Sequence, residues 1–169
     1  MECCGKINPM VRGARLYFSE STKPAIVAAL HRTPHGVWYE QETPELLANW
    51  RDEGQLAAAM FRAIERFSIK DVDFRTHYNK KTDWPAFRAS KCRSVNTFQR
   101  AYDDIFVRSL NEHELFFTAE MSPRGEDNIE LHVLINPNNA DVETSRRLLR
   151  LLHAYRRWEP LPFSAGLND

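Results

Sequence analysis

Cys92 is the side chain of this sequence best placed to act as a nucleophile. It stands just before Ser94, a residue type that commonly caps a helix, and a cysteine near a helix N-terminus can have a lowered pKa. A nucleophile also needs an oriented base, which His77, His113 or His132 could supply only through folding. The chain has neither the GxSxG nor the P-loop pattern. We therefore interpret Cys92 as a small, partly buried residue.

The histidines are spread along the chain rather than grouped as metal ligands. His31 and His35 have the separation of a helical pair, but Pro34 lies between them and disfavours a continuous helix. The HExxH pattern is absent, and no second cluster supplies further ligands. The sequence therefore predicts no metal site and no cofactor.

Carboxylates occur in close pairs, at 103–104, at 112 and 114, and at 126–127. A metal-dependent nuclease needs carboxylates that converge on one point. Adjacent acids on a helix or strand point apart, however, and pairs at turns are usually solvated. A small hydrolase or nuclease that uses Cys92 or these pairs is thus an alternative, and we predict that the protein is not an enzyme.

The last predicted helix carries a basic stripe. Arg146, Arg150, His153 and Arg157 follow one another at spacings of four, three and four residues, which places them on one helical face opposite a leucine stripe. Such a stripe is most often a solvated face. Its functional interpretation is a patch for an acidic partner surface or, with less support, for phosphates, because the donor fork of arginine suits both.

The composition is typical of one globular domain. The chain has 169 residues, of which 43% are hydrophobic and 27% charged, and its formal net charge is zero. Dedicated nucleic-acid binders usually have a basic bias, so direct binding of nucleic acid is disfavoured. The three cysteines do not form a disulfide framework, and no apolar run reaches the ~20 residues of a membrane helix. We expect a single cytoplasmic domain over 1–169 with no membrane contact and an irregular segment at 1–14.

The first half of the chain predicts short strands and helices. Strands are expected at 16–18 and 37–39. Residues 25–30 follow a proline and favour a short helix over a strand. A capped helix is expected from Thr43, and the clearest amphipathic helix of this half begins at Gln55.

The second half predicts a helix capped by Ser94, preceded by a polar loop in which Trp84 is an anchor. Three strands, around 105–107, 115–119 and 129–135, are joined by short turns and should form an antiparallel meander. The third strand alternates apolar and polar residues, as a strand with one buried face does. With the final amphipathic helix, the predicted fold class is α+β: an antiparallel sheet packed by two or three amphipathic helices.

The order of segments from Trp84 onward resembles a known family. Residues 84–91 read WPAFRASK and lead into Ser94, Val95 and Phe98, after which come LFFTAE at 115–120 and ELHVLI at 130–135. This order resembles the immunity proteins of bacterial contact-dependent growth inhibition. The resemblance covers roughly residues 84–155. It implies a small soluble protein that binds and neutralises the C-terminal domain of a cognate toxin, commonly a nuclease.

A nuclease has a basic substrate cleft, so its inhibitor should present acids. The candidates lie in or beside the meander: Glu112, Glu114, Glu120, Glu126, Asp127 and Glu130. The basic stripe is the alternative partner-binding face. A nucleic-acid-binding module remains a further alternative, and it predicts a continuous positive surface with exposed aromatic rings such as Phe116 or Tyr102.

Overall fold

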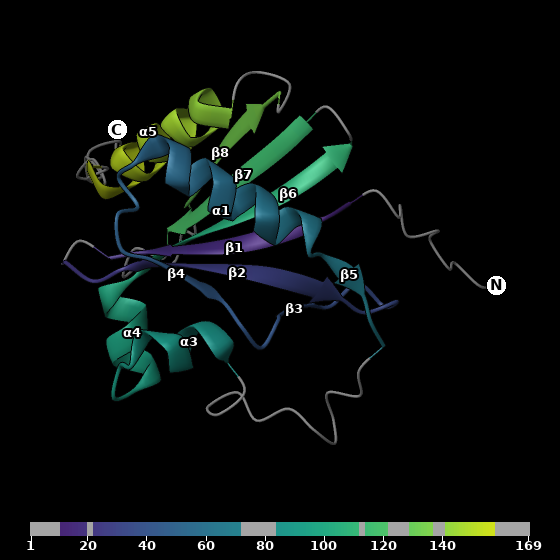
Figure 1. The fold of residues 1–169 in the computed structure, drawn as a ribbon, viewed down its shortest axis with the longest axis horizontal. Coiled ribbons are helices and arrows are strands. Elements are labelled where there is room, and N and C mark those ends of the chain that lie inside the picture. The colour runs from purple at the N-terminus through teal and green to yellow at the C-terminus, as the bar shows by residue number, and fades with distance from the viewer. Residues whose placement is uncertain are drawn as a thin grey trace, which may run out of the picture.

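The structure is a computed structural model, and it describes residues 11–19, 22–71, 84–111, 114–121, 129–136 and 141–157. Its strands form one sheet in the order β3-β2-β1-β6-β7-β8, and β4 and β5 also pair with β2 (Figure 1). The strands are β1 Gly13–Phe18, β2 Ala25–Arg32, β3 Trp38–Glu40, β4 Glu45–Leu47, β5 Ser68–Ile69, β6 Asp103–Asn111, β7 Glu114–Met121 and β8 Ile129–Ile135. The helices are α1 Glu53–Glu65, α3 Pro85–Ser90, α4 Val95–Ala101 and α5 Asp141–Arg157. This arrangement confirms the α+β class.

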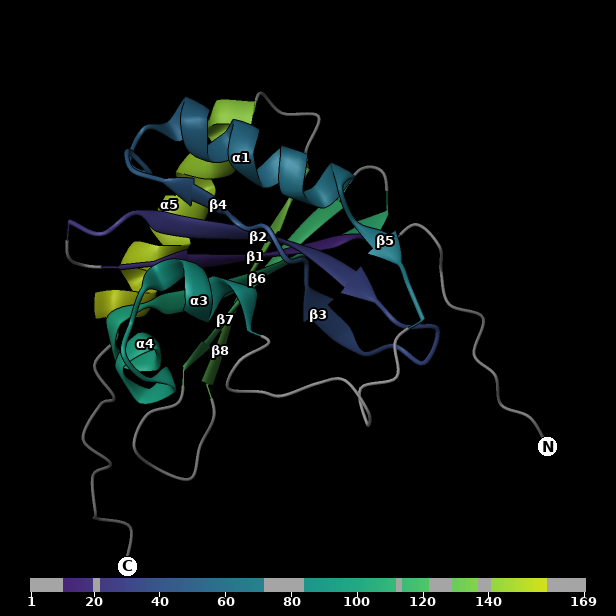
Figure 2. The same ribbon diagram turned by 60° about the horizontal axis from the view of Figure 1, so that its bottom comes forward.

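Helices cover the two faces of the sheet unequally. On one face, called here the helix face, α1 and α5 lie side by side over β1, β2, β7 and β8 (Figure 1). On the opposite face, called here the outer face, α3 and α4 pack at one end, where Ala86 and Phe98 contact Tyr17, Ile26 and Ala28 (Figure 2). Among the described residues, no helix packs on β7 and β8 from the outer side. The part of the sheet that ends in β8 therefore has one face that described helices leave open.

The larger core lies between the sheet and the pair α1 and α5. Its fully buried large side chains include Leu16 and Phe18 of β1, Ile105 and Val107 of β6, and Phe117 of β7. The helices contribute Leu56, Met60 and Leu148, which are also fully buried. Full burial of such a side chain contributes about 1.5–3 kcal/mol, so this face holds the sheet and its two long helices together.

Two helix starts have local causes that the sequence shows. The Asp52 carboxylate accepts from the backbone N–H groups of Gly54 and Gln55, both at 3.0 Å, and begins α1. The Ser94 hydroxyl accepts from the backbone N–H of Thr97 at 3.1 Å and begins α4, as predicted. Each cap satisfies donors that a helix N-terminus otherwise leaves without a partner.

Two predicted helices are strands in the structure. Residues 25–30 belong to β2, a central strand that is buried on both faces, so its apolar residues do not alternate and the periodic signal of a strand is lost. The helix expected from Thr43 to Trp50 is also wrong, because Glu45–Leu47 forms β4 and pairs with β2. In contrast, Pro85–Ser90, predicted as loop, forms α3 with its proline in the first turn. The possible strand around Phe74 and most of the segment 1–14 lie outside the described residues.

The predicted meander is confirmed. β6 pairs with β7, and β7 with β8, both antiparallel. In β8, Leu131 and Val133 pack against the core, whereas His132 and Leu134 are exposed. The alternation therefore has the predicted direction, while the side chains of Ile129, Glu130 and Ile135 lie outside the description.

Candidate functional site

The open part of the outer face is built from two rows of cross-strand neighbours. In the first row, Arg15 of β1 lies opposite Phe106 of β6, and Thr118 and His132 continue the row on β7 and β8. In the second row, Gly13 lies opposite Arg108, followed by Phe116 and Leu134. Side chains directly opposite each other in a sheet are close enough to interact. The register thus gathers two arginines and two phenylalanines on four adjacent strands.

These side chains form a continuous series of ring and guanidinium contacts, called here the cation–aromatic ladder. The ladder consists of Arg15, Arg32, Trp38, Phe106, Arg108, Phe116 and His132. The guanidinium carbon of Arg108 lies 5.4 Å from the ring centre of Phe106 and 5.3 Å from that of Phe116. Arg15 lies 5.5 Å from Phe106. Cation–π contacts at this range are attractive and hold each guanidinium in place.

The ladder extends at both ends. The ring of Phe116 stacks on His132 with centroids 4.8 Å apart. At the other end, Phe106 meets Trp38 at 5.3 Å, and Arg32 lies 5.3 Å from the Trp38 ring. Gly13 permits this end, because a Cβ there would lie 2.6 Å from the Trp38 ring.

The arginines of the ladder carry hydrogen-bond donors without acceptors. In the described structure, the Nε atoms of Arg15, Arg32 and Arg108 are shielded from solvent and have no hydrogen-bond partner. The carboxylate of Asp104 comes within 3.7 Å of the Arg15 Nε, as an ion pair. Burial opposes the charge of Arg15, but Tyr17, Asp104 and Glu40 favour it, and the net effect raises its pKa. The charged form of Arg15 is therefore favoured, while its Nε is shielded from solvent in the described structure.

A second cluster on the outer face fixes α3 to the sheet. The Glu40 carboxylate accepts from the indole N–H of Trp84 at 2.9 Å, from the backbone N–H of Ala86 at 2.7 Å and from the Tyr17 hydroxyl. Burial raises the pKa of Glu40, although these hydrogen bonds act in the opposite direction. Burial and the neighbouring Glu40 charge also raise the pKa of Tyr17 well above its usual value. Because every donor here has its acceptor, the cluster is a structural clamp, and Trp84 is the anchor that the sequence predicts.

A pocket of about 470 Å³ lies between this clamp and the ladder. Its lining includes Arg15, Tyr17, Trp84, Tyr102 and Asp104. Tyr102 is 6% exposed, so the ring suggested as a nucleic-acid contact is buried. The pocket continues the outer face rather than forming a separate site.

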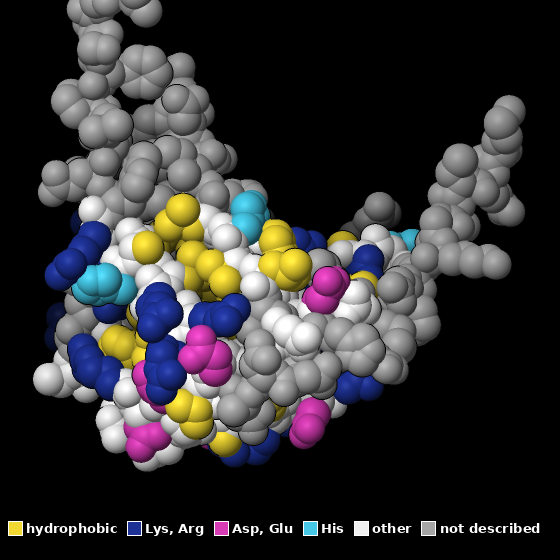
Figure 3. Space-filling view, turned by 90° about the horizontal axis from the view of Figure 1, so that it is seen from above, with side chains coloured by type: hydrophobic (Ala, Val, Ile, Leu, Met, Phe, Trp, Pro, Cys, Tyr) yellow, Lys and Arg dark blue, Asp and Glu magenta, His cyan; other side chains and the backbone are white. Residues whose placement is uncertain are grey.

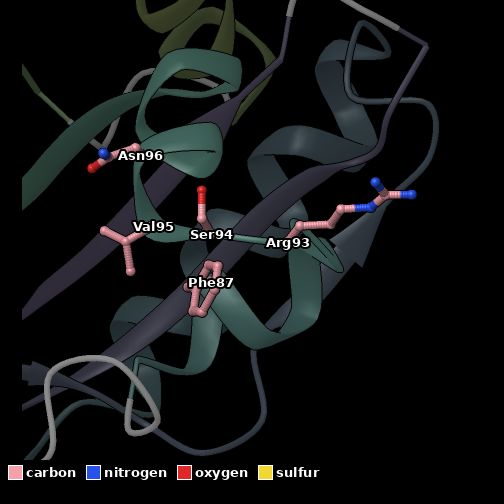
Figure 4. A pocket seen from close by; sticks show the side chains of 5 residues that line it. All are labelled: Phe87, Arg93, Ser94, Val95 and Asn96. Carbon is pink, nitrogen blue, oxygen red and sulfur yellow. The ribbon is translucent and has the colours of Figure 1, made fainter.

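A second pocket, of about 430 Å³, lies where α3 meets α4. Figure 4 shows Phe87 and Val95 close together on one side of it, while Arg93 and Asn96 extend in opposite directions. The Ser94 hydroxyl is already used as the cap of α4. No group of side chains that could perform acid–base chemistry converges in this pocket.

The basic stripe lies on the solvent side of α5, as predicted. Figure 3 shows Lys and Arg side chains gathered toward one side of this face, beside a histidine and exposed hydrophobic side chains. Arg146 is already paired, with Glu53 and with Glu143, at 3.0 Å in each case. Arg150, His153 and Arg157 are exposed, and the described structure gives them no ion pair. The stripe is therefore a real surface feature, part of which is neutralised within the protein.

The predicted acids are not gathered at one described place. Glu112, Glu126 and Asp127 lie outside the described residues. Glu114 accepts from the side-chain amide of Asn111 at 2.7 Å. Glu120 and Glu130 are directly opposite each other in the register of β7 and β8. Whether these acids bind a partner stays a prediction.

The candidate nucleophile has no described base beside it. The Cys92 thiol lies 3.8 Å from the Lys23 ammonium, and His132 stacks on Phe116 at the far end of the sheet. His77 and His113 lie outside the described residues. Among the described residues there is also no group of three His, Cys, Asp or Glu side chains that could hold a metal ion. No described helix is long and apolar enough to cross a membrane.

Comparison with known proteins identifies the fold. No protein-family model and no curated protein sequence matches the chain. A solved protein of unknown function from Neisseria meningitidis has a similar structure, with a TM-score of 0.66 and 14% identity over 86% of this chain and 95% of that chain. A chain of the CdiA-CT/CdiI toxin and immunity complex from Yersinia pseudotuberculosis is also similar. Its TM-score is 0.58, with 10% identity over 85% of this chain and 96% of that chain. At these identities the comparisons establish a shared fold.

The ladder was not predicted from the sequence. Arg15, Arg32 and Trp38 come from the first half, which offered no functional pattern, and Phe106 was considered only as a strand residue. A usable signal was the placement of Arg108 and Phe106 on alternate residues of one strand, which puts both on the same face. Their partners on other strands could not be paired without the register.

Proposed function

We propose that the protein binds a cognate toxin domain and neutralises it, as an immunity protein does. The observation that carries this proposal is the fold, shared over most of both chains with a component of a toxin and immunity complex. The sequence-level resemblance to such immunity proteins, reached without the fold, supports the same conclusion. A nuclease is the expected class of toxin.

The character of the described surface supports binding rather than catalysis. An inhibitor needs a rigid surface that complements its target, and interfaces of standard size can bind tightly without a reactive group. The sheet supplies rigidity, because α1 and α5 brace one face and the Glu40 clamp holds α3 on the other. Charged side chains on both sides of the sheet supply possible contacts.

The test is co-expression with the C-terminal domain of the cognate toxin, whose gene we expect just upstream of this one. We expect a complex that survives size-exclusion chromatography and the rescue of cell growth. A toxin domain from an unrelated system is the control and should be neither bound nor neutralised. If the folded protein gives neither complex nor rescue, the proposed function is wrong.

A further inference from the structure

We propose that the open outer face of β1, β6, β7 and β8 is the docking surface, and that it binds a carboxylate-bearing segment of the toxin domain. Arg15 and Arg108 would contact the carboxylates, and Phe116 and Leu134 would provide apolar contact beside them. This inference rests on the proposed function and names the surface that performs it.

The first support is the set of donors without acceptors. The Nε atoms of Arg15, Arg32 and Arg108 are shielded from water and make no hydrogen bond within the described structure. A shielded polar group without a partner is unfavourable, and more so when it is charged. A carboxylate that binds the terminal nitrogens of Arg15, whose side chain is 36% exposed, would stabilise the charge of the same guanidinium and so offset that cost. Because the two terminal nitrogens of a guanidinium form a fork that fits both oxygens of a carboxylate, this acceptor suits the site.

The second support is the way the rings hold the guanidinium groups. Arg108 lies between Phe106 and Phe116, at 5.4 and 5.3 Å from their ring centres. Side chains that are already ordered lose less conformational freedom when a partner binds. The ladder thus presents preordered charge, as binding hot spots with arginine beside aromatic rings do.

The third support is charge complementarity. The seven residues of the ladder include three arginines and no carboxylate. Asp104 contacts Arg15 at 3.7 Å, while no ion pair of Arg32 or Arg108 is present in the described structure. The exposed Leu134, at 52% of its surface, lies directly opposite Phe116 and adds an apolar contact at the edge of this positive area. The surface therefore favours a partner with acidic groups around an apolar side chain.

Single-stranded nucleic acid fits this face less well. Stacking of bases needs free ring faces. In the ladder, Phe106 contacts Arg15, Arg108 and Trp38, and Phe116 contacts Arg108 and His132. The chain also has no net positive charge to attract phosphates. A metal-dependent nuclease carries converging carboxylates of its own, so an acidic docking segment is compatible with a nuclease partner.

The other two charged surfaces have weaker support. Arg146 of the basic stripe is already neutralised by Glu53 and Glu143. The predicted acids are only partly described, and Glu114 already accepts a hydrogen bond within the protein. In contrast, the Nε atoms of Arg15, Arg32 and Arg108 have no acceptor among the described residues.

Leu134 offers the sharpest test, because a change at this exposed position should leave the fold intact. Leu134→Glu places a negative charge on this surface, which would repel an acidic partner. Leu134→Lys places a positive charge at the same position, which would attract that partner. We expect Leu134→Glu to weaken binding to the toxin domain about 10-fold or more, and Leu134→Lys to bind within about 3-fold of the unchanged protein. Titration calorimetry measures both. Equal effects of the two variants would overturn the acidic-partner inference.

Arg15→Gln and Arg108→Gln each remove one guanidinium group from the ladder. Arg150→Gln is the matched control, because it removes an exposed guanidinium group from α5, outside the ladder. Each ladder variant should weaken binding about 10-fold, while Arg150→Gln should change it less than about 2-fold. Raising the salt concentration should weaken the unchanged protein more than the Arg15→Gln, Arg108→Gln double variant. Thermal melts of each variant check that the fold is retained.

The outcomes separate the two proposals. If the unchanged protein does not bind the toxin domain, the proposed function and this inference both fail. If it binds, but the ladder and Leu134 variants bind equally well, the function stands and the docking surface is wrong. If Arg108→Gln instead abolishes binding of a single-stranded oligonucleotide and leaves toxin binding intact, the face serves nucleic acid and the inference is overturned.

Discussion

The indole N–H of Trp84 donates to the carboxylate of Glu40 at 2.9 Å, and this bond fastens the start of α3 to strand β3. The same carboxylate also accepts from the backbone N–H of Ala86 in the first turn of α3. Glu40 thus binds two donors at the start of α3. These two hydrogen bonds set the position of α3 and α4 over β1 and β2.

Glu40→Ala should therefore destabilise the protein strongly. The variant leaves the Trp84 indole, the Ala86 N–H and the Tyr17 hydroxyl without their acceptor, and we expect a loss of about 2–4 kcal/mol in the free energy of unfolding. Glu42→Ala is the matched control, because the Glu42 partner Arg88 is 46% exposed and Glu42 itself 80%. The control should change stability by less than about 0.5 kcal/mol in urea denaturation. Similar losses in both variants would show that the clamp is not structural.

The clamp also makes stability depend on pH. Burial raises the pKa of Glu40 above its usual 4.5, so the folded protein binds this proton more tightly than the unfolded chain. The resulting stabilisation is complete below the unfolded-state pKa and is lost as the pH rises through the folded-state pKa. Glu40→Gln does not titrate. We therefore compare the free energy of unfolding of the unchanged protein with that of Glu40→Gln by urea denaturation at several pH values. The difference in favour of the unchanged protein should fall as the pH rises from below 4.5 through the folded-state pKa of Glu40. A rise instead would mean that the hydrogen bonds to Glu40 outweigh its burial.

Strand β8 should respond to substitution according to which face each side chain occupies. Leu131 packs against the core, whereas His132 is exposed and stacks on Phe116 at 4.8 Å. Leu131→Ala should cost about 2 kcal/mol and His132→Ala about 1 kcal/mol or less. Denaturant melts of the two variants measure this difference. Equal losses would contradict the register, because a slip of one residue exchanges the two faces.

We predict that the protein has no hydrolytic activity of its own. The reason is that no described histidine lies beside Cys92 and the described residues hold no metal-ligand cluster. Incubation with nucleic acids, esters and peptides, with and without divalent metals, should give no turnover above that of buffer. Turnover that Cys92→Ala abolishes would show that the protein is an enzyme.

Charge reversal tests the two partner-binding surfaces that were predicted from the sequence, the acids near the meander and the basic stripe of α5. One double variant is Glu126→Lys with Asp127→Lys, and the other is Arg146→Glu with Arg150→Glu. If the outer face docks the toxin domain, each double should change the association rate less than about 3-fold in stopped-flow mixing at low and high salt. A large, salt-dependent loss with the acidic pair alone would support the acidic surface expected for a basic nuclease cleft. The same loss with the arginine pair would support the stripe on α5.

Short-range patterns of the sequence were sufficient for several elements. The Ser94 cap, the apolar repeat of α1 and the alternation of Leu131 to Leu134 were predicted correctly. Each depends on residues within a few positions of one another, where helix and strand periods act directly. The basic stripe of α5 was predictable for the same reason.

By itself, then, the sequence determined the α+β class, the meander and the charged face of α5. Only the tertiary structure decided that residues 25–30 form a strand, because burial on both faces removes the alternation by which a strand is recognised. It also decided the cation–aromatic ladder, whose members extend from Arg15 to His132 along the chain. Their contacts depend on the order and register of strands far apart in sequence, and strand pairing fixes these only when the whole sheet has formed.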